Sequence, residues 1–385
     1  MRGCVPLCRC ACCSWNRLAY EPEQSVPVRM KKLYNTVDKR VLRAVVAHDP
    51  EPRRTVSFYA YHPIRNPSFF RDYLYLHWEQ FGVLGRTYIA PEGINAQVSV
   101  PEVRFDAFRE HLYSISFLDG VRLNLAVQEA HHAFYALKVK LRKKIVADGI
   151  EDPAFNPSDT GMHLGAEEFN RLTSDPETIL IDMRNHYESE VGHFQGAICP
   201  DADTFREEIA LVEGMLKGKE DRNIVMYCTG GIRCEKASAY LKHKGFPHVH
   251  QLEGGIIKYA RDVQERGLEN RFRGVNFVFD ERLSERISDD VIARCHQCGK
   301  PFDHHTNCVN EGCHLLFIQC SECREHYENC CSEECRQIIH LPEDEQRQLR
   351  KKQPAGRNVF RKGRSGKLIF KSDSSQVISP PDQPA

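Results

Sequence analysis

Residues 223–241 read NIVMYCTGGIRCEKASAYL, and this stretch decides the fold of the region around it. Residues 223–227 are a short apolar run typical of a buried strand, and the segment from Glu235 onward has the composition of a helix. The two glycines between them allow backbone N–H groups to converge on one point, where the helix N-terminus adds positive potential. The stretch therefore predicts a strand, an anion-binding loop and a helix.

Cys228 lies at the mouth of this loop. Convergent N–H groups stabilise a thiolate, which lowers the pKa of the thiol and raises its reactivity at neutral pH. The alternative is an inert cysteine that closes a core strand, the most common place for a free cysteine. Gly230, Gly231 and Arg233 favour the reactive interpretation, because a packed thiol needs none of them.

The position of the arginine distinguishes two kinds of cysteine loop. Tyrosine phosphatases carry an arginine at the position that corresponds here to Cys234, where its guanidinium binds two phosphoryl oxygens. In this chain Arg233 comes one residue earlier. The loop is therefore one residue shorter than the phosphate-binding loop of tyrosine phosphatases, and its length resembles that of the rhodanese (sulfurtransferase) loop.

Upstream blocks extend this resemblance to a whole domain. Residues 179–184 read ILIDMR and residues 192–197 read GHFQGA, which matches the rhodanese pattern of strand, Asp-x-Arg and Gly-His-x-x-Gly-Ala. Strands and helices alternate through residues 162–272, as a parallel sheet requires. We expect an α/β rhodanese domain there, with a persulfide-capable thiolate at Cys228 stabilised by Gly230 and Gly231 and by the charge of Arg233. Asp182 and Arg184 are expected to pair internally and orient the loop.

The region before it, residues 50–150, predicts a different architecture. Expected elements follow the order βαββαβ, with strands at 55–61, 83–90, 94–100 and 121–127 and helices at 67–81 and 103–114. This order is the α+β ferredoxin-like arrangement, to which an alternating segment at 134–141 adds a strand. Residues 1–49 form an N-terminal extension.

The cysteines are placed unevenly. Of 17 in the chain, five fall within residues 4–13 and nine between Cys295 and Cys335. Two Cys-x2-Cys pairs predict a structural zinc site of Cys295, Cys298, Cys320 and Cys323, because paired thiolates at this spacing suit tetrahedral zinc. A second site takes Cys308, Cys313, Cys335 and either Cys330 or Cys331, with His304, His305 and His314 as alternative ligands. Residues 273–340 are therefore expected to form a small Cys-rich zinc module.

Charge does not mark the whole chain as a nucleic-acid binder, because Lys+Arg and Asp+Glu are both 53. Any RNA contact must come from local patches. One candidate patch follows the strand at 134–141; the other lies in residues 341–385, a tail whose Pro and Gly content predicts disorder. The alternatives are a solvated strand edge that its lysines protect against aggregation, for the first patch, and a tail that is merely solvating, for the second. The candidate RNA-binding residues are Lys138, Lys140, Arg142, Lys143, Lys144, Arg350, Lys351, Lys352, Arg361, Lys362 and Arg364.

The N-terminus lacks the apolar stretch of a signal peptide, and no run is long enough to span a membrane, so we expect a cytoplasmic protein with reduced thiols. Met30 begins a segment that resembles an ordinary bacterial start. Residues 1–29 are expected to reflect an upstream start assignment; the alternative is a metal-binding or acylated tail at Cys12 and Cys13. No pattern predicts an oligomeric state.

Several uncommon strings resemble one family across roughly 280 of the 385 residues. They include RTYIAPEGINAQ (residues 86–97), IVADG (145–149), DMRNHYE (182–188), CTGGIRCEK (228–236) and CHQC (295–298). Together they resemble the bacterial rhodanese-containing tRNA uridine hydroxylase (TrhO) family. The resemblance implies an acylphosphatase-like first domain, tRNA as partner, molecular oxygen as co-substrate and 5-hydroxyuridine at the wobble position as product, with Cys228 as the catalytic residue.

Two other functions remain open at this point. The loop alone is equally compatible with a sulfurtransferase that passes persulfide sulfur from Cys228 to an acceptor. The Cys-rich module and the basic tail are compatible with a non-catalytic RNA-binding adaptor. No flavin or NAD fingerprint and no iron-binding spacing occurs, so these residues do not indicate how oxygen is activated.

Overall fold

The computed structural model describes residues 33–128, 133–352 and 362–370. The expectations for residues 1–29 and for Arg361 fall outside these ranges. The first helix of the described part is α1 (Lys39–His48), which begins where the Asp38 side chain accepts a hydrogen bond from the Arg40 N–H. Among the described residues, no helix combines the length and the apolarity that a membrane crossing requires.

The predicted βαββαβ arrangement is confirmed in the first domain. Its elements are β1 (Arg53–Tyr61), α2 (Pro67–Gln80), β2 (Leu84–Ala90), β3 (Gly93–Pro101), α3 (Phe105–Tyr113) and β4 (Asn124–Leu125), with short 3₁₀ turns at Glu102–Arg104 and Ser116–Leu118. The sheet order is β4-β1-β3-β2-β5, in which β5 (Leu137–Leu141) pairs in parallel with β2 at one edge. β4 is shorter than expected, because only Val56 and Ser57 of β1 pair with it.

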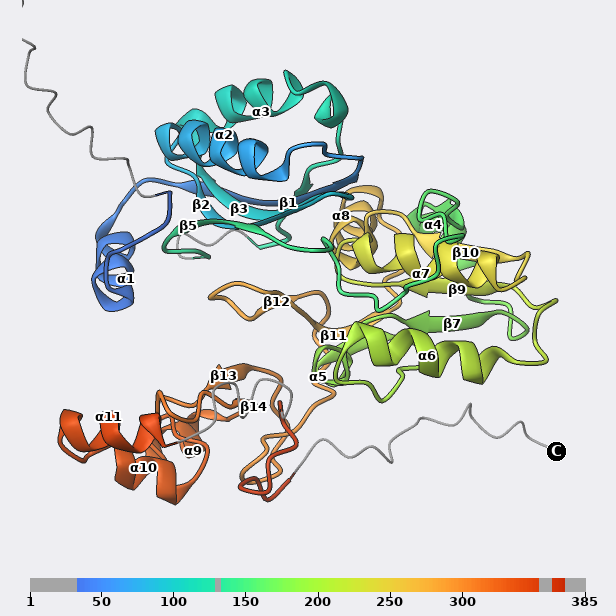
Figure 1. The fold of residues 1–385 in the computed structure, drawn as a ribbon. Coiled ribbons are helices and arrows are strands. Elements are labelled where there is room, and N and C mark those ends of the chain that lie inside the picture. The colour runs from blue at the N-terminus through green and yellow to red at the C-terminus, as the bar shows by residue number, and fades with distance from the viewer. Residues whose placement is uncertain (1–32, 129–132, 353–361, 371–385) are drawn as a thin grey trace, which may run out of the picture. The chain divides into compact units, whose positions relative to one another are not determined.

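Helices α2 and α3 lie on one face of this sheet (Figure 1). The core between them is aromatic: Trp78 packs edge-on against Phe58, with ring centroids 6.2 Å apart, and against Phe108, at 5.5 Å. All three side chains are fully buried. The opposite face of the sheet is therefore the one that is free to contact the second domain.

The second domain is the predicted rhodanese fold with a parallel sheet. Its elements are β6 (Met162–Leu164), α4 (Ala166–Leu172), β7 (Ile179–Asp182), α5 (His186–Ser189), α6 (Phe205–Leu216), β9 (Ile224–Tyr227), α7 (Ile232–His243), β10 (Val249–Leu252) and α8 (Gly255–Arg266). The strand order is β6-β10-β9-β7. Ile224 and Met226 of β9 pack with residues of α6 and α7, whereas Val225 and Tyr227 pack with residues of α4 and α8. Because both faces of β9 are covered, the whole strand is apolar, and its carboxyl end is where the cysteine loop begins.

A three-stranded antiparallel sheet connects the rhodanese domain to the Cys-rich module. It contains β12 (Ser284–Arg286), β11 (Phe272–Phe277) and β8 (Gly192–Phe194), in that order. The module itself has a hairpin of β13 (His305–Asn307) and β14 (Leu316–Ile318), followed by α9 (Ser321–His326) and α10 (Glu333–Ile339). So little regular structure cannot bury a large apolar core, and cysteines make up much of the module's two buried clusters.

Two stretches of the tail differ from the disorder that its composition predicts. Helix α11 (Glu343–Lys351) forms because acidic residues occupy its first turn and basic residues its last, and it ends before Pro354. Residues 362–370 pack onto the module: the Gly363 N–H donates to the Leu316 carbonyl at 2.9 Å and Leu368 is buried among the module's cysteines. The module supplies backbone partners that a free chain lacks.

Candidate functional site

Cys228 follows the last residue of β9, and its side chain is buried. The Gly231 N–H donates to its Sγ at 3.1 Å, and Gly231 precedes α7 with φ of 100°, a conformation that glycine adopts without strain. Burial by itself would raise the pKa of the thiol. Hydrogen bonding from Cys234, the positive charge of Arg233 and backbone N–H groups outweigh burial and lower the pKa to about 6. A pKa on this side of neutral favours the thiolate form of Cys228 at pH 7.

Arg233 is held by a residue that sequence reasoning did not single out as part of the site. Its Nη1 and Nη2 donate to Oε1 and Oε2 of Glu188 at 2.7 and 2.8 Å, and Glu188 is fully buried. Burial raises the pKa of Glu188, but the adjacent Arg233 charge lowers it overall. The only local signal for Glu188 is the capping box that it forms with Asn185 at the start of α5. The pair fixes the guanidinium beside the loop.

Asp182 and Arg184 form a second bidentate pair, 2.6 and 2.8 Å long and fully buried. The Tyr227 hydroxyl also donates to Asp182, at 2.8 Å, and Arg184 donates to the Gly192 carbonyl at 2.6 Å. These contacts tie β7 to β9 and to β8. Both residues therefore belong to the strand framework below the loop, and their side chains form hydrogen bonds there and not with Cys228.

Cys234, the other thiol of the loop, is fully buried in the core cluster beneath it. Its hydrogen bond stabilises the Cys228 thiolate, and the same bond together with burial raises the pKa of Cys234 itself. The side chain packs inward and acts as a donor to Cys228.

The first domain covers the loop, which the sequence did not predict. The Tyr59 hydroxyl lies so close to Gly231 that a Cβ at that glycine would approach it to 2.7 Å. The Tyr61 hydroxyl donates to the Ile232 carbonyl at 3.2 Å, and the Asn124 amide donates to the Gly230 carbonyl at 3.3 Å. Only the tertiary structure brings β1 and β4 to this loop; the sequence signal for it is no more than two tyrosines on the same face of one strand.

A buried ion cluster holds the two domains together at α7. Lys236, which is 1% exposed, donates to Glu92 at 2.7 Å and also pairs with Asp148. Lys144 pairs with Asp148 at 2.5 Å. Two of the family-like strings, those containing Glu92 and Asp148, thus supply partners to one lysine on the helix that follows the loop. Lys144, a candidate RNA-binding residue, lies at the edge of this cluster with its side chain 35% exposed.

A cavity of about 70 Å³ opens between the uncovered face of the first sheet and the loop. We call it the loop cavity. Its wall includes two residues of the cysteine loop, Thr229 and Gly230. It also includes Phe279, which follows the end of β11. Polar side chains from the first sheet face it: Ser57, Tyr59, Asn95, Gln97 and Asn124. The cavity therefore combines apolar walls with amide and hydroxyl groups and with one charged cluster, in which Arg282 pairs with Asp280 and Glu285.

A second cavity, of about 420 Å³, shares Phe134, Phe279 and Asp280 with the first. We call it the basic cavity, because four cations line it together with two tyrosines: Arg86, Lys138, Lys140, Lys362, Tyr88 and Tyr135. The Lys362 Nζ lies 3.6 Å from the centroid of the Tyr187 ring, and burial lowers its pKa to about 8.

The structure brings together only some of the candidate RNA-binding residues. Lys138, Lys140 and Lys362 line the basic cavity, and Arg142 stacks on Tyr88 at 5.0 Å, whereas Lys143 is exposed. The remaining tail residues do not line it. Arg350 pairs with Glu311 at 3.2 Å, Arg364 pairs with Asp201 and Asp203, and Lys351 and Lys352 are exposed at the end of α11.

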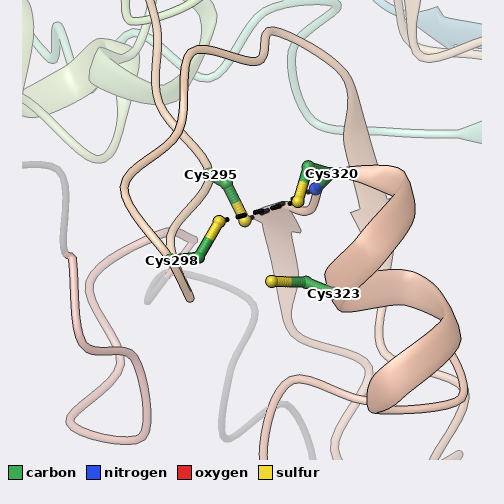
Figure 2. Close-up of side chains that lie close together, drawn as sticks. All are labelled: Cys295, Cys298, Cys320 and Cys323. Atoms are coloured by element: carbon green, nitrogen blue, oxygen red, sulfur yellow. Dashed lines mark hydrogen bonds between the residues drawn. The ribbon is translucent and has the colours of Figure 1, made fainter.

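The module contains two groups of four cysteines suited to metal. In each, the sulfur atoms lie within 4.8 Å of one another; the groups are Cys295, Cys298, Cys320, Cys323 and Cys308, Cys313, Cys331, Cys335. Figure 2 shows the first group, in which two sulfurs from a loop face two from the start of α9. The choice left open by the sequence goes to Cys331, and neither Cys330 nor any of the three histidines belongs to a group. Four thiolates suit tetrahedral zinc, and the Cys320 N–H donates to the Cys295 Sγ at 3.4 Å, as outer hydrogen bonds to a metal ligand do.

Comparison with known proteins agrees with this division into domains. Family models match residues 53–145 (UPF0176 acylphosphatase like domain), 165–262 (Rhodanese-like domain) and 273–336 (Rhodanase C-terminal). Among solved structures, the rhodanese-like domain of an Anabaena protein is 20% identical over 29% of this chain and 78% of its own, with a TM-score of 0.24. That likeness is too partial to bear on activity.

Curated relatives match almost the full length of this chain. The tRNA uridine(34) hydroxylase of Pectobacterium atrosepticum is 54% identical over 87% of this chain and 95% of its own. That of Sodalis glossinidius is 55% identical over 87% of this chain and 96% of its own. Identity at this level over nearly the whole of both chains shows the family: this protein belongs to the tRNA uridine(34) hydroxylases.

Proposed function

We propose that this enzyme hydroxylates C5 of uridine 34 in tRNA, using molecular oxygen and the thiolate of Cys228. The observation that carries the proposal is a thiol with a pKa of about 6 on a loop whose next two residues line a base-sized cavity. A thiolate can add to C6 of a uracil ring: the S–C6 bond forms while the C5=C6 electron pair moves to C5 and O4. C5 becomes nucleophilic as a result. One oxygen atom of the co-substrate then forms the new bond at C5, while the other leaves as water with two protons and with two electrons from an external reductant.

The lining of the loop cavity suits a uracil ring. Asn95, Gln97 and Asn124 offer amide groups that can both donate and accept, which matches the alternating carbonyl and N–H groups of the base edge. Phe279 offers an aromatic face on which the base can stack. A base in this cavity would lie against the loop that carries Cys228.

The basic cavity is the proposed path of the RNA backbone. Because it shares Phe134, Phe279 and Asp280 with the loop cavity, a nucleotide in one has its neighbours in the other. Lysine and arginine side chains neutralise phosphates, and Tyr88 and Tyr135 can stack flanking bases. A tRNA substrate also implies that the protein acts where tRNA is present, in the cytoplasm.

The two cysteine groups are proposed to bind structural zinc. Their thiolates would complete a tetrahedral shell with no open position, which is the arrangement of structural and not of catalytic sites. The module then contributes a stable support for β11 and for the tail segment that carries Lys362.

The test is replacement of Cys228 by serine, with Cys199→Ser as the matched control, since Cys199 is a free thiol outside the loop. Nucleosides from tRNA treated with oxygen and each variant are measured by mass spectrometry. We expect Cys228→Ser to lose on the order of 10³-fold or more in 5-hydroxyuridine formation and Cys199→Ser to retain it. Wild-type yield from Cys228→Ser would refute the thiolate role.

Sulfur transfer is the second candidate, favoured by the same lowered pKa in a rhodanese loop. It predicts that thiosulfate adds one sulfur atom to Cys228 and that an acceptor removes it. Mass spectrometry of the intact protein with tRNA, thiosulfate and oxygen separates the two: hydroxylation without persulfide turnover supports the first candidate. A non-catalytic adaptor is not supported, because the family to which the chain belongs consists of enzymes.

A further inference from the structure

Tyr59 belongs to the first domain but lies at the rhodanese loop. It lines the loop cavity, and its hydroxyl is the atom nearest to the place that a Gly231 side chain would take. The same Gly231 donates its N–H to the Cys228 sulfur. The phenol therefore stands beside the nucleophile and faces the space proposed for the base.

The Tyr59 hydroxyl is one end of a chain of polar contacts that leads to solvent. It donates to Glu235 Oε1 at 2.9 Å, and His163 Nε2 lies 3.0 Å from the same oxygen. Gln251 donates to the other oxygen of Glu235 at 3.1 Å. The Glu235 side chain is 13% exposed and the His163 side chain 40%, so these contacts lead from the loop cavity to the surface.

The proposed reaction needs a base at this place. Once the hydroxyl is on C5, that carbon still carries its hydrogen and C6 still carries the Cys228 sulfur. To restore the aromatic-like ring, the C5–H pair must form the C5=C6 bond while the C6–S pair returns to sulfur and one proton leaves. Cys228 cannot take this proton, because its sulfur is the leaving group. The nearby carboxylates are already paired with arginines: Glu188 with Arg233, and the two that line the loop cavity, Asp280 and Glu285, with Arg282.

We propose that Tyr59, Glu235 and His163 form the proton relay that takes the C5 proton out of the loop cavity. This inference rests on the proposed function. The Tyr59 oxygen accepts the proton from C5 while its own hydroxyl proton passes to Glu235. Glu235 passes this proton to Nε2 of the neutral His163 imidazole, whose Nδ1 releases a proton to water. No electrons are gained or lost in the relay, and the thiolate is regenerated.

The directions in which the pKa values of Tyr59 and Glu235 are shifted agree with a concerted proton transfer through the phenol. Burial, followed by the charge of Glu235, raises the pKa of Tyr59 well above its usual value, so the phenol keeps its proton until another arrives. Burial would raise the pKa of Glu235, but its hydrogen bonds to His163 and Tyr59 lower it, so the acceptor is ionised.

The experiment compares Tyr59→Phe with Tyr61→Phe on tRNA that carries hydrogen or deuterium at C5 of uridine 34. Tyr61 comes from the same strand and also contacts α7, but it does not line the loop cavity. We expect Tyr59→Phe to lower kcat by about 10²-fold or more with KM little changed, the size typical of a lost general base. We also expect a C5-deuterium isotope effect larger than that of the wild type, and a covalent Cys228–RNA adduct that accumulates on denaturing gels.

Two outcomes are distinguished clearly. If the wild type forms 5-hydroxyuridine but Tyr59→Phe shows neither adduct accumulation nor an increased isotope effect, the relay is refuted and the proposed function stands. If the wild type forms no 5-hydroxyuridine, the proposed function itself fails. At the surface end, we expect His163→Asn to lose several-fold in kcat and to regain it with added imidazole, because the site is open to solvent; loss without rescue contradicts a role in proton delivery.

Discussion

Cysteine is used in two different ways in the loop and in the module. In the loop, hydrogen-bond donors and Arg233 lower the pKa of a single thiol, which belongs to no group of three or more possible metal ligands among the described residues. In the module eight thiols lie in two groups of four, where each is close enough to share an ion with three others. The difference teaches that the surroundings of the sulfur, and not the residue type, decide between nucleophile and ligand.

The largest effect should come from breaking a metal group. We expect Cys331→Ser to lose one of two bound ions and to unfold the module, because a structural zinc contributes roughly 10 kcal/mol or more of folding free energy. Cys330→Ser is the matched control, since Cys330 is buried next to Cys331 but lies outside the group. Metal content by plasma mass spectrometry and thermal melting measure both; equal metal loss in the two variants would contradict the grouping.

The helix that follows the loop is held by buried ion pairs and not by metal, and Lys236→Met tests how much these pairs contribute to stability. The change leaves Asp148, fully buried, and Glu92 without their shared cation, which should cost about 3–5 kcal/mol of unfolding free energy. Lys242→Met on the same helix removes a pair with the exposed Asp159 and should cost less than about 1 kcal/mol. Urea denaturation measures the unfolding free energy of both variants. Similar decreases in the two would show that the buried cluster contributes no more to stability than the exposed pair.

Removing the charge beside the nucleophile should make it resemble an ordinary thiol. In Arg233→Gln the pKa of Cys228 should rise above about 6, because the charge of Arg233 is lost, although the hydrogen bond from Cys234 still lowers the pKa. Arg233→Lys keeps the positive charge and should keep most of the shift. The pH dependence of iodoacetamide labelling at Cys228, followed by peptide mass spectrometry, measures the midpoint; an unchanged midpoint in Arg233→Gln would remove Arg233 as a cause.

The smallest effect is expected where the module's tail segment meets the proposed RNA path. Lys362→Gln should raise KM for tRNA a few-fold and leave kcat unchanged, because a phosphate contact binds ground state and transition state alike. The slope of log affinity against log salt should fall by about 0.7 if one phosphate contact is lost. The control is Lys143→Gln, because Lys143 is exposed and does not line the basic cavity. An equal change in both variants would indicate only a general electrostatic attraction between the protein and RNA.

Local patterns were enough to predict most elements and the reactive thiol. The apolar run of β9, the glycines and the alternation of strands and helices gave the rhodanese domain and Cys228, because these features act within a few residues of each other. Paired cysteines likewise gave eight metal-ligand candidates, with the single choice between Cys330 and Cys331 left open. Where the tail is concerned, composition predicted disorder, but residues 362–370 gain partners such as Leu316 that composition does not reveal.

What the sequence alone determined, then, is the chemistry available at Cys228 and the identity of the domains, since both follow from short stretches of chain. Only the tertiary structure decided which residues surround that chemistry. It brought Glu188 to Arg233, Lys236 to Asp148 and Tyr59 to Gly231 across separations of 45, 88 and roughly 170 residues. The physical reason is that such contacts come from the packing of one domain face on another, which no local periodicity encodes.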